Sequence, residues 1–173
     1  ESDEGFTPVE NTVRYGLTAI KGMGSSSVQA IVEARKTGRF TSLFDFCGRL
    51  GAGAVNRRGL ESLISAGAFD SLMPEDITAG SWRSRLTAAI DPALTQGQRM
   101  AEDRLRGQSG LFGVADAAET NAAENLPDAE PWSQAEIATR EKAAVGFYLS
   151  TPPLDNYTDL LSTLRLRNIA EIE

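Results

Sequence analysis

Two glycines that stand one residue apart, Gly22 and Gly24, separate two short stretches that favour helix. Because glycine has no Cβ, it adopts positive φ readily and lets another backbone approach closely, so this pair predicts a tight turn. Three consecutive serines follow the turn and favour the start of a helix, with Val28 and Ile31 on its apolar face. The stretch 17–32 therefore predicts a short helix, a Gly-x-Gly turn and a second helix, which is a helix-hairpin-helix.

The predicted turn is suited to binding an anion. Backbone N–H groups at the start of a helix have no partners within the helix, and the helix dipole makes that end positive. Lys21 adds a charged side chain beside them. This combination fits one backbone phosphate of DNA. The alternative is an ordinary glycine-rich turn between two core helices, since a single Gly-x-Gly pair has little specificity.

Composition narrows the possible functions. The 173 residues are 41% hydrophobic, which is enough for the core of one ordinary domain. With no histidine and a single cysteine, Cys47, the chain cannot form the usual zinc sites, a histidine-based catalytic site or an internal disulfide, which argues against a small hydrolase. No apolar run approaches the ~20 residues that cross a bilayer. We expect a cytoplasmic protein with no membrane partner.

The net charge of −7 argues against a nucleic-acid partner until it is divided along the sequence. Residues 14–61 contain eight basic and three acidic side chains, whereas the segments on both sides are acidic. The basic segment contains the Gly-x-Gly turn. Since local charge governs contact with phosphate more than the total does, the acidic balance of the whole chain does not exclude DNA. The alternative is that these charges are ordinary solvated helix faces.

Local signals elsewhere predict a mainly α fold with a short N-terminal β-hairpin and a helical C-terminal extension. The β-leaning runs 6–9 and 12–15 favour the hairpin. The helix signals are caps at Ser42 with Asp45, at Asn56 and at Ser133 with Glu136, helical patterns over 81–90 and 92–106, a cap and first-turn proline at Asp91-Pro92, and a core stripe of Trp82, Leu86 and Ile90.

Two arginines, Arg57 and Arg58, occupy the first turn of the helix that Asn56 is expected to cap. Basic side chains at that position oppose the helix dipole, so they suggest contact with a second phosphate. The alternative is that they pair with nearby acids. With the first turn, this segment predicts two hairpin units packed as one four-helix domain. A tandem arrangement of this kind can hold two phosphates of one duplex, on either side of the minor groove.

A short motif, Gln108-Ser109-Gly110-Leu111-Phe112, stands before an acidic stretch. Val114 to Pro131 contains five acidic residues and no basic one, a composition that favours flexibility. Gln-x-x-Leu-Phe at the start of a flexible tether resembles a peptide that binds a sliding clamp, with the glutamine at the rim of a pocket and the two apolar side chains inside it. The alternative is that Leu111 and Phe112 pin the end of the preceding helix to its own domain.

Several motifs resemble, in the same order, the bacterial DNA polymerase III alpha subunit family of C-family replicative polymerases. They are Val13–Gly24 (VRYGLTAIKGMG), Ser42–Cys47 (SLFDFC), Asn56–Arg58 (NRR), Ser65–Asp70 (SAGAFD) and Gly146–Ser150 (GFYLS). The resemblance implies a fragment with the end of the fingers region and the β-hairpin (1–16), a tandem helix-hairpin-helix DNA-binding domain (17–107), a clamp-binding motif (108–113), an acidic flexible linker (114–131) and a helical segment leading to a missing OB domain (132–173).

By matching positions, the resemblance also implies which residues bind. Those expected at the first phosphate are Lys21, Gly22, Met23, Gly24 and Ser25; those expected near the second are Arg57 and Arg58; those expected on the clamp are Gln108, Ser109, Gly110, Leu111 and Phe112. Two departures stand out. The family usually has a bulkier or acidic residue at Gly110, and it has Ser-Gly-His-Pro-Leu where this chain has Ser150-Thr151-Pro152-Pro153-Leu154.

The resemblance implies a parent protein that is a DNA-directed DNA polymerase using Mg²⁺. Its expected partners are double-stranded DNA, the sliding clamp (the beta subunit) and the other subunits of the polymerase III holoenzyme. The catalytic aspartates of the family belong to a palm domain outside this chain, so we expect the fragment to have no catalytic residue, metal or cofactor of its own. Two alternatives stay open, namely the same region of an accessory error-prone alpha-type polymerase and a free-standing DNA-binding clamp adaptor.

Overall fold

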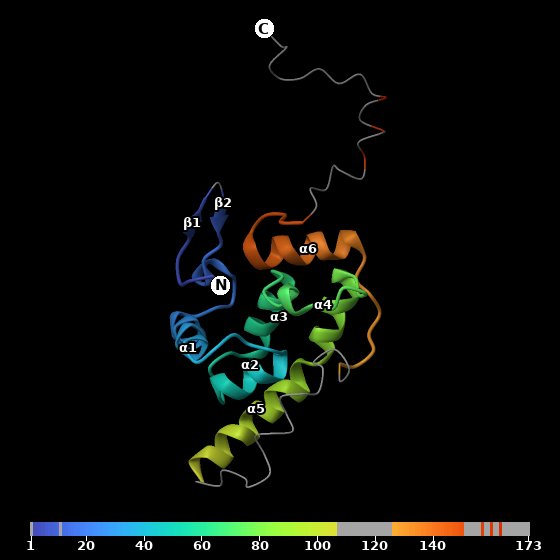
Figure 1. Cartoon of the computed structure of the whole chain (residues 1–173). Coiled ribbons are helices and arrows are strands. Elements are labelled where there is room, and N and C mark those ends of the chain that lie inside the picture. Colours follow the sequence, from blue (N-terminus) through green and yellow to red (C-terminus); the bar gives the residue numbers. More distant parts are fainter. Residues whose placement is uncertain are drawn as a thin grey trace.

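The computed structural model describes residues 2–10, 12–106 and 126–150, together with 157, 160 and 163. Figure 1 shows a mainly helical arrangement with one small hairpin, which confirms the predicted fold class. The elements are β1 (Thr7–Val9), β2 (Thr12–Arg14), the 3₁₀ turn η1 (Leu17–Ala19), α1 (Ser25–Arg35), α2 (Leu43–Leu50), α3 (Arg57–Ser65), the 3₁₀ turn η2 (Asp70–Leu72), α4 (Ala79–Ala88), α5 (Ile90–Leu105) and α6 (Gln134–Val145). Among the described helices, none is long and apolar enough to span a membrane.

The predicted hairpin is present near the N-terminus. Strands β1 and β2 pair in antiparallel register, with Thr7 opposite Arg14 and Val9 opposite Thr12. Glu10 turns the chain between the strands with a φ of 52°. The first helix of the predicted helix-hairpin-helix, which follows β2, is only the single 3₁₀ turn η1.

The predicted helix caps form as the sequence indicates. The Ser42 hydroxyl accepts a hydrogen bond of 2.9 Å from the Asp45 amide at the start of α2. The Asn56 side chain accepts one of 2.8 Å from the Gly59 amide at the start of α3. At the start of α6, the Ser133 hydroxyl accepts a hydrogen bond of 3.2 Å from the Glu136 amide, as expected. These bonds satisfy N–H groups that have no partner inside their own helix, so the residues concerned determine where each helix begins.

The boundary between α4 and α5 differs from the prediction. Asp91 and Pro92 were expected to cap and open the second helix, but α5 begins at Ile90, and Ala89, in a near-helical conformation, separates it from α4. Ala89 and Ile90 are both fully buried, so packing carries the helix across the expected break. Pro92 is tolerated because the first turn of a helix does not need its N–H group.

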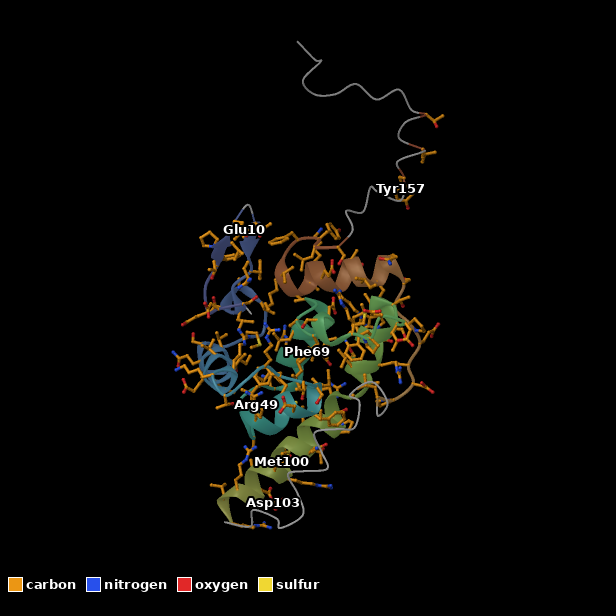
Figure 2. All side chains as sticks on the ribbon, in the orientation of Figure 1. Glu10, Arg49, Phe69, Met100, Asp103 and Tyr157 are labelled. Carbon is orange, nitrogen blue, oxygen red and sulfur yellow. The ribbon has the colours of Figure 1, made fainter. Side chains whose placement is uncertain are left out.

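The core lies where α2, α3, α4 and α5 meet. Phe69 is near the centre of the helical body in Figure 2, whereas Met100 and Asp103 lie on the projecting end of α5. The stripe predicted as core is almost completely buried, as are the apolar residues of α3; together they are Trp82, Leu86, Ile90, Leu60, Leu63 and Ile64. Helices α2 and α5 approach closely because Gly97 has no side chain, and a Cβ there would lie 2.7 Å from the Cys47 carbonyl oxygen.

Helix α6 returns to the body of the domain and lies across α3 and α4 (Figure 1). Ahead of it, the Trp132 amide donates to the Gly80 carbonyl oxygen at 3.2 Å. At its other end, Ala144 and Val145 are buried in the common core. Helix α6 is thus part of the same packed unit as the helices that precede it.

Candidate nucleic-acid interface

The predicted Gly-x-Gly turn exists and is held by backbone hydrogen bonds. Gly22 has a φ of +86°, a conformation that glycine adopts without strain. The Met23 amide donates to the Ile20 carbonyl oxygen at 3.2 Å, which closes the turn. The Lys21 amide donates to the Ala144 carbonyl oxygen of α6 at 2.9 Å. The turn therefore has a defined shape, and its Lys21 amide is already occupied.

The start of α1 is open. Its N-cap is Gly24, which has no side chain to accept a hydrogen bond, and no acidic residue stands in the first turn. The amides of Ser25, Ser26 and Ser27 have no hydrogen-bond partner within the described residues. The positive end of the helix dipole and these donors face solvent together, which is the arrangement that binds anions. The Lys21 side chain, four residues before Ser25 in the sequence, is also exposed.

The start of α3 packs against this same turn. A Cβ built on Gly22 would lie 3.6 Å from Cγ of Arg58, and one on Gly59 would lie 3.3 Å from the Met23 sulfur. Arg58 is exposed and makes no ion pair within the part of the chain that the structure describes. Packing thus brings Arg58 beside the first hairpin, although the sequence suggested a role near a second phosphate.

Arg57 is engaged with acids instead. Its Nε lies 2.9 Å from a carboxylate oxygen of Glu61, one turn along α3, and its Nη1 hydrogen-bonds Asp91 of α5. The hydrogen bonds to Asp91 and Glu61 raise the pKa of Arg57 above its usual value, so it stays cationic. The ion-pair alternative considered from the sequence therefore describes Arg57, while the exposed cations near the turn are Lys21 and Arg58.

Other basic residues of the 14–61 segment also serve the fold. The Arg49 guanidinium donates to the carbonyl oxygens of Ala34, Gly38 and Arg39 and so covers the C-terminal end of α1. Arg35 donates to the Ser2 carbonyl oxygen at 2.6 Å. The local positive charge is therefore partly internal, and it does not act as one uniform patch.

A second Gly-x-Gly turn joins α2 to α3. Gly51 and Gly53 have φ values of +80° and +79°, and a Cβ at either would meet no atom within 4 Å. The sequence suggested only a helix stop here, although the same spacing between two helices was the available signal. Unlike the start of α1, the start of α3 is capped by Asn56. The first hairpin therefore offers backbone N–H groups that have no partner among the residues that the structure describes, whereas in the second the Asn56 side chain already accepts from one of them.

The proposed clamp motif, Gln108 to Phe112, lies outside the described residues. The helix that leads toward it is described, and its last turn is exposed, with 88% of Leu105 accessible to solvent. In Figure 1 the C-terminal end of α5 projects beyond the other helices.

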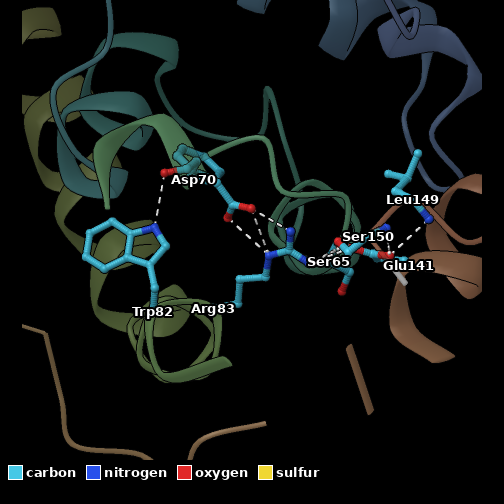
Figure 3. A network of polar contacts seen from close by, with 8 residues as sticks. Ser65, Asp70, Trp82, Arg83, Glu141, Leu149 and Ser150 are labelled. Atoms are coloured by element: carbon cyan, nitrogen blue, oxygen red, sulfur yellow. Dashed lines mark hydrogen bonds and ion pairs between the residues drawn. The ribbon is translucent and has the colours of Figure 1, made fainter. Parts of the chain in front are cut away.

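A buried ionic network, which sequence reasoning missed, joins α4 and α6 (Figure 3). Arg83 Nη1 lies 3.0 Å from Glu141 Oε1, and Arg83 also pairs with Asp70. Burial by itself raises the pKa of Glu141, but hydrogen bonds from Ser150, Arg83 and Leu149 outweigh it and hold this pKa below the usual value. The network is structural in character, because each of its charges has a partner.

No arrangement that could perform metal chemistry is found in the described ranges, where no three histidine, cysteine, aspartate or glutamate side chains gather to hold a metal ion. The single cysteine, Cys47, is buried in α2, and burial raises its pKa to about 12. A thiol in this state is a poor nucleophile. Near the Gly22 turn, the groups that the described part of the chain offers to a ligand are the open backbone amides at the start of α1 and the exposed side chains of Lys21 and Arg58.

Comparison with known proteins agrees with a helical fold that contains a helix-hairpin-helix. A family model described as a helix-hairpin-helix motif matches residues 1–80. Among curated relatives, the DNA polymerase III subunit alpha of Neisseria meningitidis serogroup A is 38% identical over 100% of this chain. Those of Xylella fastidiosa (strain Temecula1) and Escherichia coli (strain K12) are 37% and 34% identical over 85% and 86% of it.

The chain spans only 12% to 14% of the length of these relatives, so it corresponds to a limited segment of them. The matching order of motifs, the mainly helical fold and the helix-hairpin-helix match all agree on one assignment. The chain belongs to the DNA polymerase III alpha subunit family, matches a limited segment of its relatives, and itself carries a helix-hairpin-helix motif over residues 1–80.

Proposed function

We propose that this segment binds the sugar–phosphate backbone of duplex DNA without preference for sequence. The supporting observation is the uncapped start of α1, which follows a turn that contains the exposed Lys21 and packs against the exposed Arg58, in a chain that matches a helix-hairpin-helix motif. A phosphate at this position would accept hydrogen bonds from the amides that follow Gly24 and would be flanked by both charges. Contacts of this kind carry no base information and weaken as salt rises.

The second hairpin is proposed as the weaker of two backbone contacts. Its turn, at Gly51 to Gly53, is open to an approaching backbone, but the start of α3 is capped and Arg57 is shared with two carboxylates. A phosphate there would have to compete with Glu61 and Asp91 for the guanidinium. We expect Arg57 to contribute less to DNA binding than Lys21 or Arg58.

For the whole protein, we infer a DNA-directed DNA polymerase that uses Mg²⁺ and works with the other holoenzyme subunits. This inference rests on the names of the relatives and on the matching motifs. The segment itself is expected to synthesise no DNA, because the family's catalytic aspartates belong to another domain. The same region of an error-prone alpha-type polymerase would serve the same purpose of holding duplex DNA.

Binding to the sliding clamp is the second function that we propose, through Gln108, Ser109, Gly110, Leu111 and Phe112. The observation that favours it is the exposed last turn of α5, where Leu105 finds no place in the core. The proposal requires the motif that follows this helix to be accessible to a partner. A single peptide of this kind binds weakly, and the DNA contacts of the same chain would raise its effective concentration at the clamp.

The test of DNA binding compares substitutions that remove one positive charge at or against the turn before α1 with a substitution that removes one positive charge at the other end of α1. Fluorescence anisotropy with two duplexes of unrelated sequence would be measured for the wild-type chain, Lys21→Ala, Arg58→Ala and Lys36→Ala. Lys36 is the matched control, since it lies just after α1 and pairs with Glu33 in an exposed ion pair.

We expect Lys21→Ala and Arg58→Ala to weaken binding of both duplexes and to lower the slope of log K against log salt by about 0.9 each. Lys36→Ala should leave that slope near the wild-type value. Equal losses for all three variants would show diffuse electrostatic attraction instead of a phosphate site. A wild-type chain that binds neither duplex at low salt would refute the proposal.

A further inference from the structure

The C-terminal end of α6 meets the proposed phosphate-binding turn directly. The Lys21 amide donates to the Ala144 carbonyl oxygen at 2.9 Å, and the Tyr15 hydroxyl donates to the Val145 carbonyl oxygen at 2.8 Å. The last carbonyl groups of a helix have no partners inside the helix, so these two bonds satisfy groups that would otherwise need water. The bond between Tyr15 and Val145 joins residues that are 130 positions apart in the sequence.

The position of α6 is in turn determined by Glu141. Its side chain is completely buried, and one carboxylate oxygen accepts from Arg83 while the other accepts from the amides of Leu149 and Ser150 at 3.1 and 2.9 Å. Figure 3 shows how this carboxylate lies between α4 and the segment that follows α6. A carboxylate has two acceptor oxygens and can accept from all of these donors. A glutamine side chain in its place would point its NH2 group at some of them, so that one donor would face another.

The other end of α6 is held where the chain enters it. The Trp132 amide bonds to the Gly80 carbonyl oxygen at 3.2 Å, and a Cβ on Gly80 would lie only 2.3 Å from the Trp132 carbonyl oxygen. The helix is therefore secured before its first residue, at Glu141 and at its last two carbonyl groups. The helix-hairpin-helix match ends at residue 80, so none of α6 belongs to the matched motif.

We propose that α6 is a splint that holds the turn at Lys21 to Ser25 in its DNA-binding conformation, with Tyr15 and Glu141 as the positioning residues. This inference rests on the DNA-backbone binding proposed above. A site whose donors are already oriented loses less conformational entropy on binding than one that must order itself. Substitutions at Tyr15 or Glu141 that loosen α6 should therefore weaken DNA binding, although neither side chain belongs to the proposed phosphate site.

Tyr15→Phe is the sharpest variant, because it removes a single hydroxyl group. The ring contacts with Phe6 and Phe147, at centroid distances of 4.8 and 5.5 Å, need no hydroxyl and are retained. We expect faster hydrogen exchange at the Lys21 amide, measured by NMR on the full 173-residue chain. We also expect duplex affinity to fall about two- to fivefold, the scale of one neutral hydrogen bond.

Glu141→Gln tests the anchor, with Glu136→Gln as its control. Both substitutions remove one negative charge from the same helix, but Glu136 pairs only with Arg140 on the exposed face. A general electrostatic effect on DNA binding would therefore appear equally in both. The splint predicts that Glu141→Gln alone accelerates exchange at Lys21 and weakens DNA binding, while Glu136→Gln matches or slightly exceeds the wild-type affinity.

The possible results separate this inference from the DNA function on which it rests. If the wild-type chain binds duplex DNA and both Tyr15→Phe and Glu141→Gln behave like Glu136→Gln in exchange and affinity, α6 is no splint. If exchange at Lys21 accelerates while affinity stays unchanged, the turn is held but its order does not serve binding, which also overturns the inference. Absence of duplex binding by the wild-type chain refutes the proposed function itself.

Discussion

The guanidinium of Arg83 in α4 and the carboxylate of Glu141 in α6 form a buried ion pair with an Nη1–Oε1 distance of 3.0 Å. The two residues are 58 positions apart, and their side chains are 6% and 0% exposed. Arg83 also donates to the Ser65 carbonyl oxygen at the end of α3 and to Asp70. One arginine thus joins α3, α4, α6 and η2, so we expect the stability of the helical unit to depend on it.

Removing this arginine should strongly destabilise the fold. Arg83→Met leaves Glu141 charged and buried without its cation, a change that costs about 3–5 kcal/mol in other buried pairs. The free energy of unfolding in urea would measure it. Arg106→Met, which breaks the exposed pair with Glu102, is the control and should change that free energy by less than about 1 kcal/mol. A loss for Arg83→Met no larger than for the control would contradict the structural importance of the network.

Stability should fall in acid because of Glu141. In the folded chain the pKa of Glu141 is lowered from the ordinary value of 4.5. The carboxylate therefore contributes fully to the free energy of unfolding above pH 4.5, and this contribution is lost as the pH falls through the lower pKa of the folded state. Urea midpoints measured from pH 6 down to pH 3 should drop more steeply in the wild-type chain than in Glu141→Gln. Glu136→Gln should keep the wild-type profile. Parallel profiles for wild type and Glu141→Gln would show that this carboxylate does not carry the acid sensitivity.

The thiol of Cys47 should be inert in the folded chain. Burial raises its pKa to about 12, whereas an exposed cysteine has a pKa near 8.5. At pH 8 the thiolate fraction is therefore lower by about a thousandfold or more than in the unfolded chain. A chromogenic disulfide reagent should react slowly with the native protein and fast in concentrated urea. Rapid stoichiometric reaction under native conditions would show that α2 does not bury this residue.

The clamp motif can be tested by removing its two apolar side chains. Leu111→Ala/Phe112→Ala should abolish measurable binding to the sliding clamp in calorimetry, since anchors in a pocket carry most of the energy of such contacts. Leu105→Ala, which removes an exposed apolar side chain just upstream, should bind like the wild type. If the double substitution leaves clamp binding intact but lowers the melting temperature, the two residues belong to the core, as the alternative interpretation holds.

Features that depend on neighbours within about four residues were predictable. The caps at Ser42 and Asn56, the turn at Gly22 and the buried stripe that starts at Trp82 all follow from local hydrogen bonding, backbone freedom and helical period. The boundary error at Asp91-Pro92 arose because burial of the residue just before this pair outweighs a local start signal.

Relationships between distant residues were decided only by the packing of the helices. The sequence alone determined the tight turn at Gly22 and the helix that begins just after Gly24, because these depend on backbone chemistry. It did not determine that Arg58 lies beside Gly22, or that Arg57 is taken up by an aspartate 34 positions away. Nor did it place Glu141 beside Arg83, because a charge finds its partner through the crossing of helices, which no short pattern of residues encodes.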